Sequence, residues 1–521
     1  MPMLQDDDYI GQAARIETFG ANILFDRDRV DNLAATVPQS SYGEVISSLG
    51  VGTLRYPGGS VSESILDIDN VDSSVQNGVE VTGLGDFLNF CAASRASLTM
   101  VMPTARFYDR ASADTENPIS DEDAESIVAF VTKLLNDALV KGVGVEAIEL
   151  GNEWWGTDLS ASEYGRLASQ MSVIVQGAID EFISSNQLPS AWVEPEILVQ
   201  VGHLTDASQE TQQIFDEFNT VAEQTAIDGL VTHRYLSGDF SQIGSPGVFL
   251  PFYGQFDEWD RLAESNSNFG NLSRHVSEWN VKANNDEERG LKSASCLVKL
   301  VAELLAADVD QANIWAIQQN NSQRLAMSTG LPNSNSSGLT INGEMFRLMS
   351  ESVVGLRLVA HSRIDDRNLI NVDEDCLTAF GGPHRVVVFI SERNGVNESI
   401  SLNVEALLGD FSHVWGTVLG TTDENPLDPL ALPDLEILSG SAALPFQNGV
   451  LSFDLDPWET IRLIFTTDTS GAEISGHYDN DILSGSTGPD RIFGSAGNDR
   501  LEGFFGSDTL LGGEGDDVLQ G

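Results

Sequence analysis

The chain has 521 residues, of which 41% are hydrophobic, and its formal net charge is −52. This length predicts two or three domains rather than a single core, and the hydrophobic fraction excludes wholesale disorder. The excess of carboxylates disfavours nucleic acid and anionic membrane surfaces as partners, and it predicts that salt or bound cations screen the repulsion.

No stretch stays apolar for the roughly 18 residues that a membrane helix needs, so no membrane span is predicted. Residues 1–8 have neither a basic segment nor an apolar run, and so do not resemble an N-terminal signal peptide. Cys91, Cys296 and Cys376 are too few and too far apart to predict a disulfide framework or a zinc site.

The first 340 residues alternate short apolar runs with longer helical patterns, which is typical of βα units and a parallel sheet. Ser120 and Ser160 begin two of the expected helices, the second with a capping box. We therefore predict an α/β fold with a (β/α)₈ TIM barrel over residues 13–345, and a doubly wound open sheet is the alternative. The eight expected strands are 21–25, 53–56, 98–103, 147–150, 197–201, 230–233, 274–278 and 313–317.

Residues 346–467 have a different sequence pattern, in which short runs of β-forming residues are separated by Gly, Asn, Asp and Pro. Helical periodicity fades there, and the pattern predicts an accessory antiparallel β-sandwich. Residues 468–475 are expected to form a linker.

Residues 476–521 repeat with a period of nine, and this period predicts a C-terminal parallel β-roll that binds structural Ca²⁺. Glycines supply the tight turns, aliphatic residues follow each repeated aspartate by two positions, and carboxylates with turn carbonyls supply hard oxygen ligands. A disordered Gly/Asp-rich tail is the alternative, although it would not keep the aliphatic register. The candidate calcium ligands are Asp481, Asp490, Asp499, Asp508 and Asp517.

Two glutamates follow strand-like runs and carry the chemical prediction. Glu153 lies in Gly-Asn-Glu-Trp-Trp after the fourth expected strand, and Glu278 lies in Ser-Glu-Trp-Asn at the end of the seventh. In a barrel both would lie at the C-terminal face, where active sites form. A pair of carboxyl groups across such a mouth is what glycoside hydrolysis requires.

These motifs resemble clan A of the glycoside hydrolases. Leu54-Arg-Tyr-Pro-Gly-Gly59 at the second strand and Thr232-His-Arg-Tyr235 at the sixth are similar to elements of the family 51 arabinofuranosidases. Related features occur in the family 39 xylosidases and family 79 glucuronidases. The resemblance covers residues 15–465 and implies a retaining glycoside hydrolase that acts on an oligo- or polysaccharide and needs no cofactor for catalysis.

Residue by residue, the resemblance implies that Glu153 is the acid/base and Glu278 the nucleophile. It also gives roles to six further residues. Asn152 would bind the sugar 2-hydroxyl, Arg55 and Tyr235 would orient the nucleophile, and His233 would lie near the acid/base. Trp315 is the expected stacking platform, and Trp154 is expected to line a further subsite, although both could instead be core residues.

Two other classes of function stay open from the sequence. One is a non-catalytic carbohydrate-binding or adhesive protein on a glycosidase-like barrel, and the other is a metal-dependent barrel hydrolase or a polysaccharide lyase. The few histidines form no ligand motif, which disfavours the metal-dependent class. The nonapeptides resemble RTX repeats, which implies an extracellular protein secreted by a type I apparatus, in agreement with the expected lack of a signal peptide.

Overall fold

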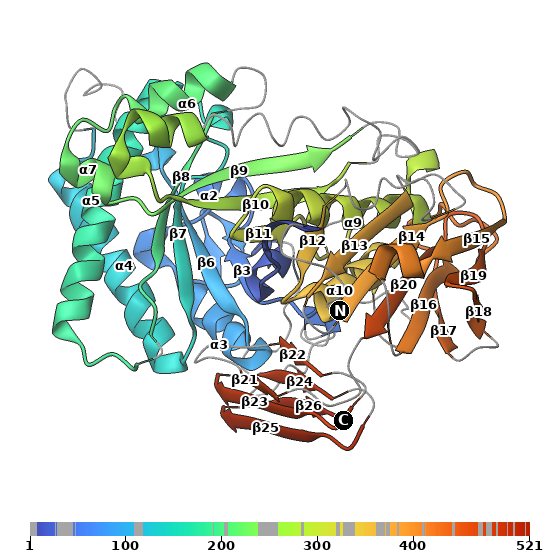
Figure 1. Ribbon diagram of the computed structural model, residues 1–521. Coiled ribbons are helices and arrows are strands. Elements are labelled where there is room, and N and C mark those ends of the chain that lie inside the picture. The colour runs from blue at the N-terminus through green and yellow to red at the C-terminus, as the bar shows by residue number, and fades with distance from the viewer. Residues whose placement is uncertain are drawn as a thin grey trace.

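The computed structural model shows a closed barrel, a β-sandwich and a C-terminal roll (Figure 1). It describes residues 8–26, 28, 45–46, 48–108, 118–190, 192–202, 207–237, 259–282, 286–318, 323–326, 339–360, 370, 376–382, 385–408, 411, 413–439, 443–466, 473–475, 482–485, 488–497, 499–503, 506–515 and 517–521.

Eight parallel strands close into a barrel in sequence order, with the last strand pairing to the first. Each strand overlaps one of the eight runs expected from the sequence. The predicted TIM barrel is therefore confirmed, and the alternative of an open sheet is wrong. The strands are β2 (Gly20–Asn22), β3 (Thr53–Tyr56), β6 (Ser97–Met102), β7 (Val145–Leu150), β8 (Glu196–Gln200), β9 (Gly229–Leu236), β10 (Ser273–Val281) and β11 (Gln311–Ile314).

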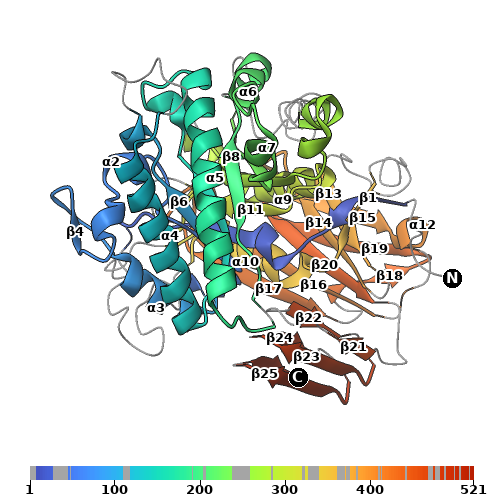
Figure 2. The ribbon, with the colours of Figure 1, turned by 90° about the vertical axis from the view of Figure 1, so that its left-hand side faces the viewer.

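Helices surround the barrel because each buries one apolar stripe against it. The Ser120 hydroxyl accepts from the backbone N–H of Asp123 at the start of α4, and Ser160 forms the expected capping box with Glu163 at the start of α5. These two long helices cover one side of the barrel (Figure 2). The main helices are α3 (Leu84–Ser94), α4 (Asp121–Lys141), α5 (Ala161–Ser185), α6 (Ala207–Phe215), α7 (Val221–Thr225), α9 (Leu291–Ala306) and α10 (Ile341–Val353).

The sandwich pairs a seven-stranded antiparallel sheet with a three-stranded one around a separate aliphatic core. This confirms the predicted antiparallel sandwich. The large sheet contains β1 (Tyr9–Ala13), β12 (Arg357–Val359), β13 (Leu377–Gly381), β14 (Arg385–Ser391), β20 (Thr460–Thr466), β16 (His413–Thr421) and β17 (Pro433–Ser439). The small sheet contains β15 (Glu398–Asn403), β19 (Val450–Leu455) and β18 (Phe446–Gln447).

Two segments near the expected domain boundaries join the barrel to the sandwich. Strand β1 pairs antiparallel with β12, so residues before the barrel complete the sandwich sheet. Helix α10 spans residues 345 and 346, where the sequence placed the boundary, and its buried residues pack as part of the barrel core. The barrel and the sandwich therefore share structural elements at their junction.

The roll has two parallel three-stranded sheets, which confirms its predicted architecture. Each strand pairs with the strand 18 residues further on, so two nonapeptides make one coil. Ile492 and Leu501 are fully buried between the sheets. The strands are β21 (Glu473–Ser475), β22 (Ile482–Ser484), β23 (Arg491–Ala496), β24 (Arg500–Glu502), β25 (Thr509–Glu514) and β26 (Val518–Gln520).

The roll begins three residues before its expected start, because β21 already pairs with β23. The last part of the expected linker is therefore strand, and residues 468–472 lie outside the described part of the chain.

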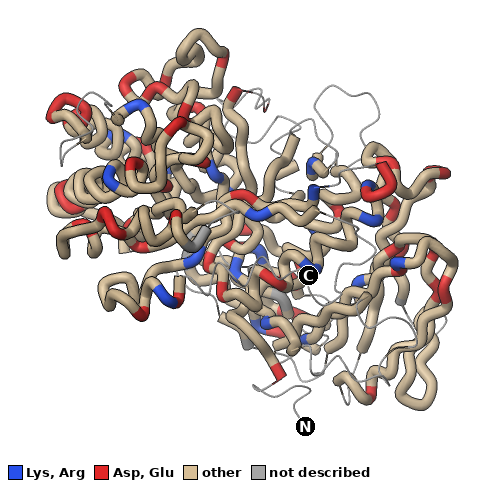
Figure 3. Tube along the Cα trace, turned by 90° about the horizontal axis from the view of Figure 1, so that it is seen from above, with Lys and Arg blue, Asp and Glu red and all other residues tan. Residues whose placement is uncertain are grey.

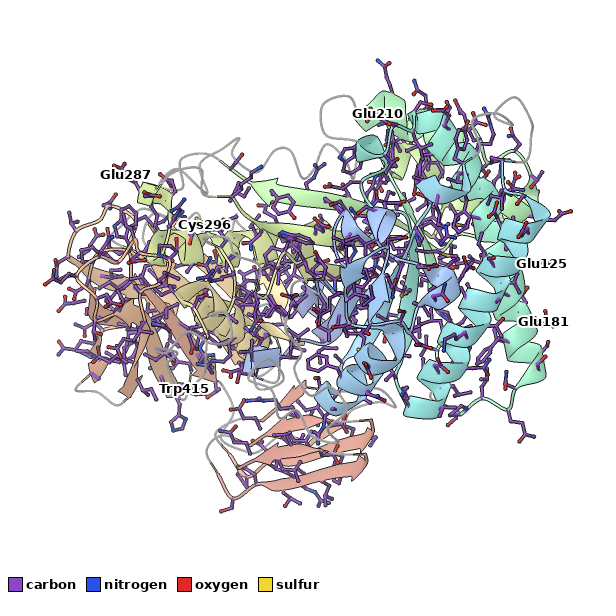
Figure 4. The ribbon with its side chains drawn as sticks, turned by 180° about the vertical axis from the view of Figure 1, so that it is seen from behind. Glu125, Glu181, Glu210, Glu287, Cys296 and Trp415 are labelled. Atoms are coloured by element: carbon purple, nitrogen blue, oxygen red, sulfur yellow. The ribbon has the colours of Figure 1, made fainter. Side chains whose placement is uncertain are left out.

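Asp and Glu residues occur throughout the described chain and outnumber Lys and Arg (Figure 3). Glu125 on α4 and Glu181 on α5, for example, are exposed on the outer side of the barrel (Figure 4). None of the helices in the described residues is long and apolar enough to cross a membrane.

Candidate active site

The turn after β7 presents Asn152 and Glu153 at the C-terminal end of the barrel. Gly151 has a φ of +85°, and a Cβ there would lie 2.7 Å from the Thr104 hydroxyl, so the turn requires glycine. Glu153 itself has a φ of +47°. Left-handed backbone at a residue other than glycine costs about 1–3 kcal/mol and tends to occur at functional sites.

The partly buried Glu63 carboxylate holds this turn in place. It accepts hydrogen bonds from the backbone N–H of Thr104, Ala105 and Asn152 and from the Thr104 hydroxyl. Burial raises the pKa of Glu63, although these four donors oppose the shift. Glu63 thereby connects the turns after β6 and β7.

Arg55 on β3 is fully buried at the centre of the site, and all five of its N–H groups donate. Nε and Nη2 donate to the two oxygens of Glu149 at 2.6 and 2.8 Å. Nη1 donates to Glu278 at 3.0 Å and to Asn22 at 2.9 Å, and Nη2 also donates to Asn152 at 2.7 Å. One guanidinium thus links four strands and holds two candidate site residues, Glu278 and Asn152.

Glu278 on β10 points into the barrel because the strand is irregular there. The register between β9 and β10 shifts between Val276 and Glu278, and the side chains of both Ser277 and Glu278 reach the interior. Such bulges re-aim side chains beside active sites. Glu278 is 4% exposed, and its second oxygen accepts a 2.8 Å hydrogen bond from the Tyr235 hydroxyl.

His233 lies between the two glutamates. Its Nδ1 is 3.1 Å from Glu153 Oε1 and 3.5 Å from Glu278 Oε2. One donor atom from each of these three residues lies within 4.8 Å of the other two, a spacing at which a metal ion could bind. Both oxygens of Glu278 already accept strong hydrogen bonds and share the charge of Arg55, which leaves little negative charge for a cation.

The environment sets the charge of the surrounding groups. Burial raises the pKa of Tyr235 well above its usual value, and the Glu278 carboxylate raises it further, so Tyr235 remains a donor. Burial also opposes the ionisation of Glu149, but Arg55 outweighs it, and the pKa of Glu149 is lowered. The interior thus keeps Glu149 ionised beside the guanidinium of Arg55.

The tryptophans divide between surface and core. Trp315 is half-buried at the end of β11, and its ring lies against Gly59, where a Cβ could not fit. Trp154 is 3% exposed, donates to the Val201 carbonyl and stacks on Tyr164. Of the two places that the sequence left open for Trp154, a subsite or the core, this packing favours the core. Trp155, the next residue, has its ring edge-on to His233 and is the tryptophan of this turn nearer the site.

Five residues of this network went unnoticed in the sequence, namely Asn22, Glu63, Glu149, Gln200 and Ser277. Gln200 and Ser277 donate to Glu149, and Asn22 accepts from Arg55. Glu149, Gln200 and Asn22 carried a signal, since each is a polar residue within an apolar strand and must find a buried partner. Glu63 lies in the short helix α2 (Val61–Ser64), where no such pattern marks it.

The roll fits calcium by the chemistry and arrangement of its oxygens. Asp490 and Asp499 are 1% exposed, and their backbone N–H groups donate to Asp508 and Asp517 of the next coil at 2.9 Å. A Cβ on Gly485 would collide with Asp490 Oδ2 and lie 2.9 Å from the Gly503 carbonyl, so these oxygens converge on one turn. Carboxylates and carbonyls are the ligands Ca²⁺ prefers. Asp481 lies outside the described residues.

Comparisons with known proteins agree with this architecture. Residues 475–508 and 502–521 match the RTX calcium-binding nonapeptide repeat. No curated protein sequence matches the chain.

Solved structures similar to this chain are glycoside hydrolases of low sequence identity. The family 51 arabinofuranosidase from Xanthomonas axonopodis pv. citri has a TM-score of 0.56 and 14% identity, over 88% of this chain and 98% of its own. A family 51 α-L-arabinofuranosidase from Bifidobacterium longum has a TM-score of 0.58 and 12% identity, over 89% and 99%. A family 44 xyloglucanase from Paenibacillus polymyxa has a TM-score of 0.52 and 11% identity, over 88% and 98%. The chain therefore combines a TIM-barrel fold similar to that of these family 51 and family 44 enzymes with a C-terminal segment of RTX calcium-binding repeats.

Proposed function

We propose that this protein is a retaining glycoside hydrolase, with Glu278 as the nucleophile and Glu153 as the acid/base. The observation that carries the proposal is the pair of carboxyl oxygens, which lie within 4.8 Å of each other. Retaining enzymes have carboxyl groups about 5 Å apart, whereas inverting enzymes need room for a water between them.

The two glutamates differ as these roles require. Glu278 is nearly inaccessible, and donors on both oxygens fix its orientation, as suits attack on an anomeric carbon. The Glu153 side chain is 38% exposed and contacts His233, so it can exchange protons with water. It would protonate the leaving oxygen in the first step and deprotonate water in the second.

The neighbouring residues suit a sugar between the glutamates. Asn152 accepts from Arg55 through its oxygen, while its buried Nδ2 has no hydrogen-bond partner within the described residues. We assign that amide to the substrate 2-hydroxyl, where a hydrogen bond strengthens in the oxocarbenium-like transition state. Trp315 would pack against a sugar face from the opposite side of the mouth.

We also propose that the enzyme works outside the cell. RTX repeats are typical of proteins exported by type I secretion, and calcium at extracellular levels would fold the roll after export. We divide the chain into a barrel over 13–345, a sandwich over 346–467 and a roll whose first strand begins at residue 473, with α10 and β1 joining the first two.

The test uses aryl α-L-arabinofuranosides, aryl β-D-xylosides, arabinoxylan and xyloglucan with the full chain and calcium. Proton NMR of fresh product should show the anomeric configuration of the substrate. Inverted product would contradict the assignment of Glu278 as nucleophile. Binding without turnover on every substrate would favour a non-catalytic carbohydrate-binding protein instead.

A further inference from the structure

Glu149 is the carboxylate closest to Arg55, and it never reaches the mouth of the site. It lies on the inner face of β7, fully buried, with both oxygens against the guanidinium. Gln200 and Ser277 donate to the same Glu149 oxygen at 2.9 and 3.1 Å. A carboxylate in this position cannot touch a sugar bound at the barrel mouth, so it acts through Arg55.

The contacts of Arg55 assign two effects to Glu149. First, the bidentate pair fixes the plane of the guanidinium, and the plane decides where Nη1 and Nη2 point. Those nitrogens hold Glu278 and Asn152. Second, one positive charge is shared between two buried carboxylates, so Glu278 receives only part of it.

We propose that Glu149 is a positioning residue of the reaction: it orients Arg55 toward Glu278 and takes up part of its charge, which keeps Glu278 nucleophilic. This inference rests on the proposed function. A carboxylate paired alone with a buried guanidinium is more strongly stabilised and a weaker nucleophile, because attack on carbon must disperse the same charge.

Five charged or titratable groups act on Glu278. Arg55 faces it from β3, His233 and Tyr235 face it from β9, and Glu153 faces it from the turn after β7. Glu149 acts on it from β7 through the guanidinium. Neutralising Glu149 removes one negative charge from this set, which favours the ionised form of Glu278. The acid limb of kcat/KM should therefore move to lower pH.

Two variants separate charge from position. Glu149→Gln keeps the size but not the charge, and we expect the acid limb to fall by about one pH unit with a 10- to 100-fold loss of kcat, roughly. Glu149→Asp keeps the charge that the buried arginine needs but cannot reach both nitrogens. We expect Glu149→Asp to have a lower kcat and the same acid limb of kcat/KM as the wild type. This variant also allows the inference to be tested if Glu149→Gln does not fold.

Glu196→Gln is the matched control, because Glu196 pairs with His275 and Ser273 at the first residue of β8, at the other end of the barrel. It should leave the pH profile as in the wild type. A wild-type acid limb in Glu149→Gln, or wild-type kcat in Glu149→Asp, would overturn the inference. If the wild-type enzyme hydrolyses no glycoside, the proposed function itself fails, which is a different result.

Discussion

Among single residues, Glu153 and Glu278 sit in environments that differ in exposure and in donors. Glu278 is 4% exposed and bound by Arg55 and Tyr235, whereas the Glu153 side chain is 38% exposed in a strained left-handed turn. Two carboxyl groups within 4.8 Å can thus serve as a fixed nucleophile and an exchangeable acid. The difference comes from the barrel, because Arg55 on β3 and Tyr235 on β9 both donate to Glu278.

This asymmetry predicts different losses on substitution. Glu278→Gln should remove turnover of every substrate by more than about 10³-fold, because no glycosyl-enzyme can form. Glu153→Gln should lose about 10²–10⁴-fold on natural glycosides but far less on activated aryl glycosides, whose leaving groups need little protonation. Azide should partly restore the second variant by replacing the general base. Steady-state rates on both substrate types provide the measurement, and equal losses without rescue would reverse our assignment of roles.

At the scale of strands and turns, the turn after β7 holds the acid/base through its glycine. In Gly151→Ala the alanine would have a strained positive φ, and its Cβ would also collide with Thr104. In Gly142→Ala the alanine would have a similar φ of +68°, but its Cβ would lie in open space. Both variants should lose about 1 kcal/mol from backbone strain, with Gly151→Ala losing a further 1–3 kcal/mol or so from the collision.

The activity of the two glycine variants then tests the role of the turn. Thermal melts should show a lower Tm for both, and more so for Gly151→Ala. A substantial loss of kcat should occur only in Gly151→Ala. Gly142 ends helix α4 and precedes β7, whereas Gly151 follows β7 at the end of the strand that carries the site. Equal kcat in the two variants would mean that the position of Glu153 does not depend on this glycine.

Local patterns were enough to predict the eight barrel strands, the caps at Ser120 and Ser160, and the nonapeptide coil. They could not predict contacts made across the barrel. The pairing of β1 with β12 joins segments about 350 residues apart, and the irregularity in β10 leaves no mark in its apolar pattern. The sequence left the place of Trp154 open, because a tryptophan beside a catalytic motif has the same sequence whether it faces a sugar or Tyr164.

Across the whole molecule, the roll lies below the barrel and sandwich rather than apart from them (Figure 1). Arg500 on β24 is 3.8 Å from Glu351 on α10, and Glu502 lines a cavity with Trp415 and Arg462 of the sandwich sheet. The roll folds with calcium, so calcium should also stabilise whatever the roll docks against. The contact predicts a barrel that stays folded and active in chelator but melts a few degrees lower, as a loss of about 1 kcal/mol would give.

Glu502 makes this coupling depend on pH. Burial raises its pKa, and the like charge of Glu351 adds to the shift, although Arg500, Arg385 and Arg462 oppose it. The docked roll therefore binds a proton that the undocked roll releases, so docking is strongest at acidic pH and weakens as the pH rises through the raised pKa. The difference in barrel Tm between calcium and chelator should accordingly be larger at pH 5 than at pH 8.

Glu502→Gln should make that difference equally large at both pH values, because the neutral side chain has no proton to lose. Arg491 is exposed on the neighbouring strand β23. The variant Arg491→Gln leaves the repeated aspartates of the roll unchanged and should behave as the wild type. It thereby controls for any weakening of calcium binding at low pH. Circular dichroism at each pH should show the roll losing β structure in chelator, and tryptophan fluorescence melts should report the barrel. A wild-type difference that is the same at pH 5 and pH 8 would show that the buried Glu502 does not govern docking.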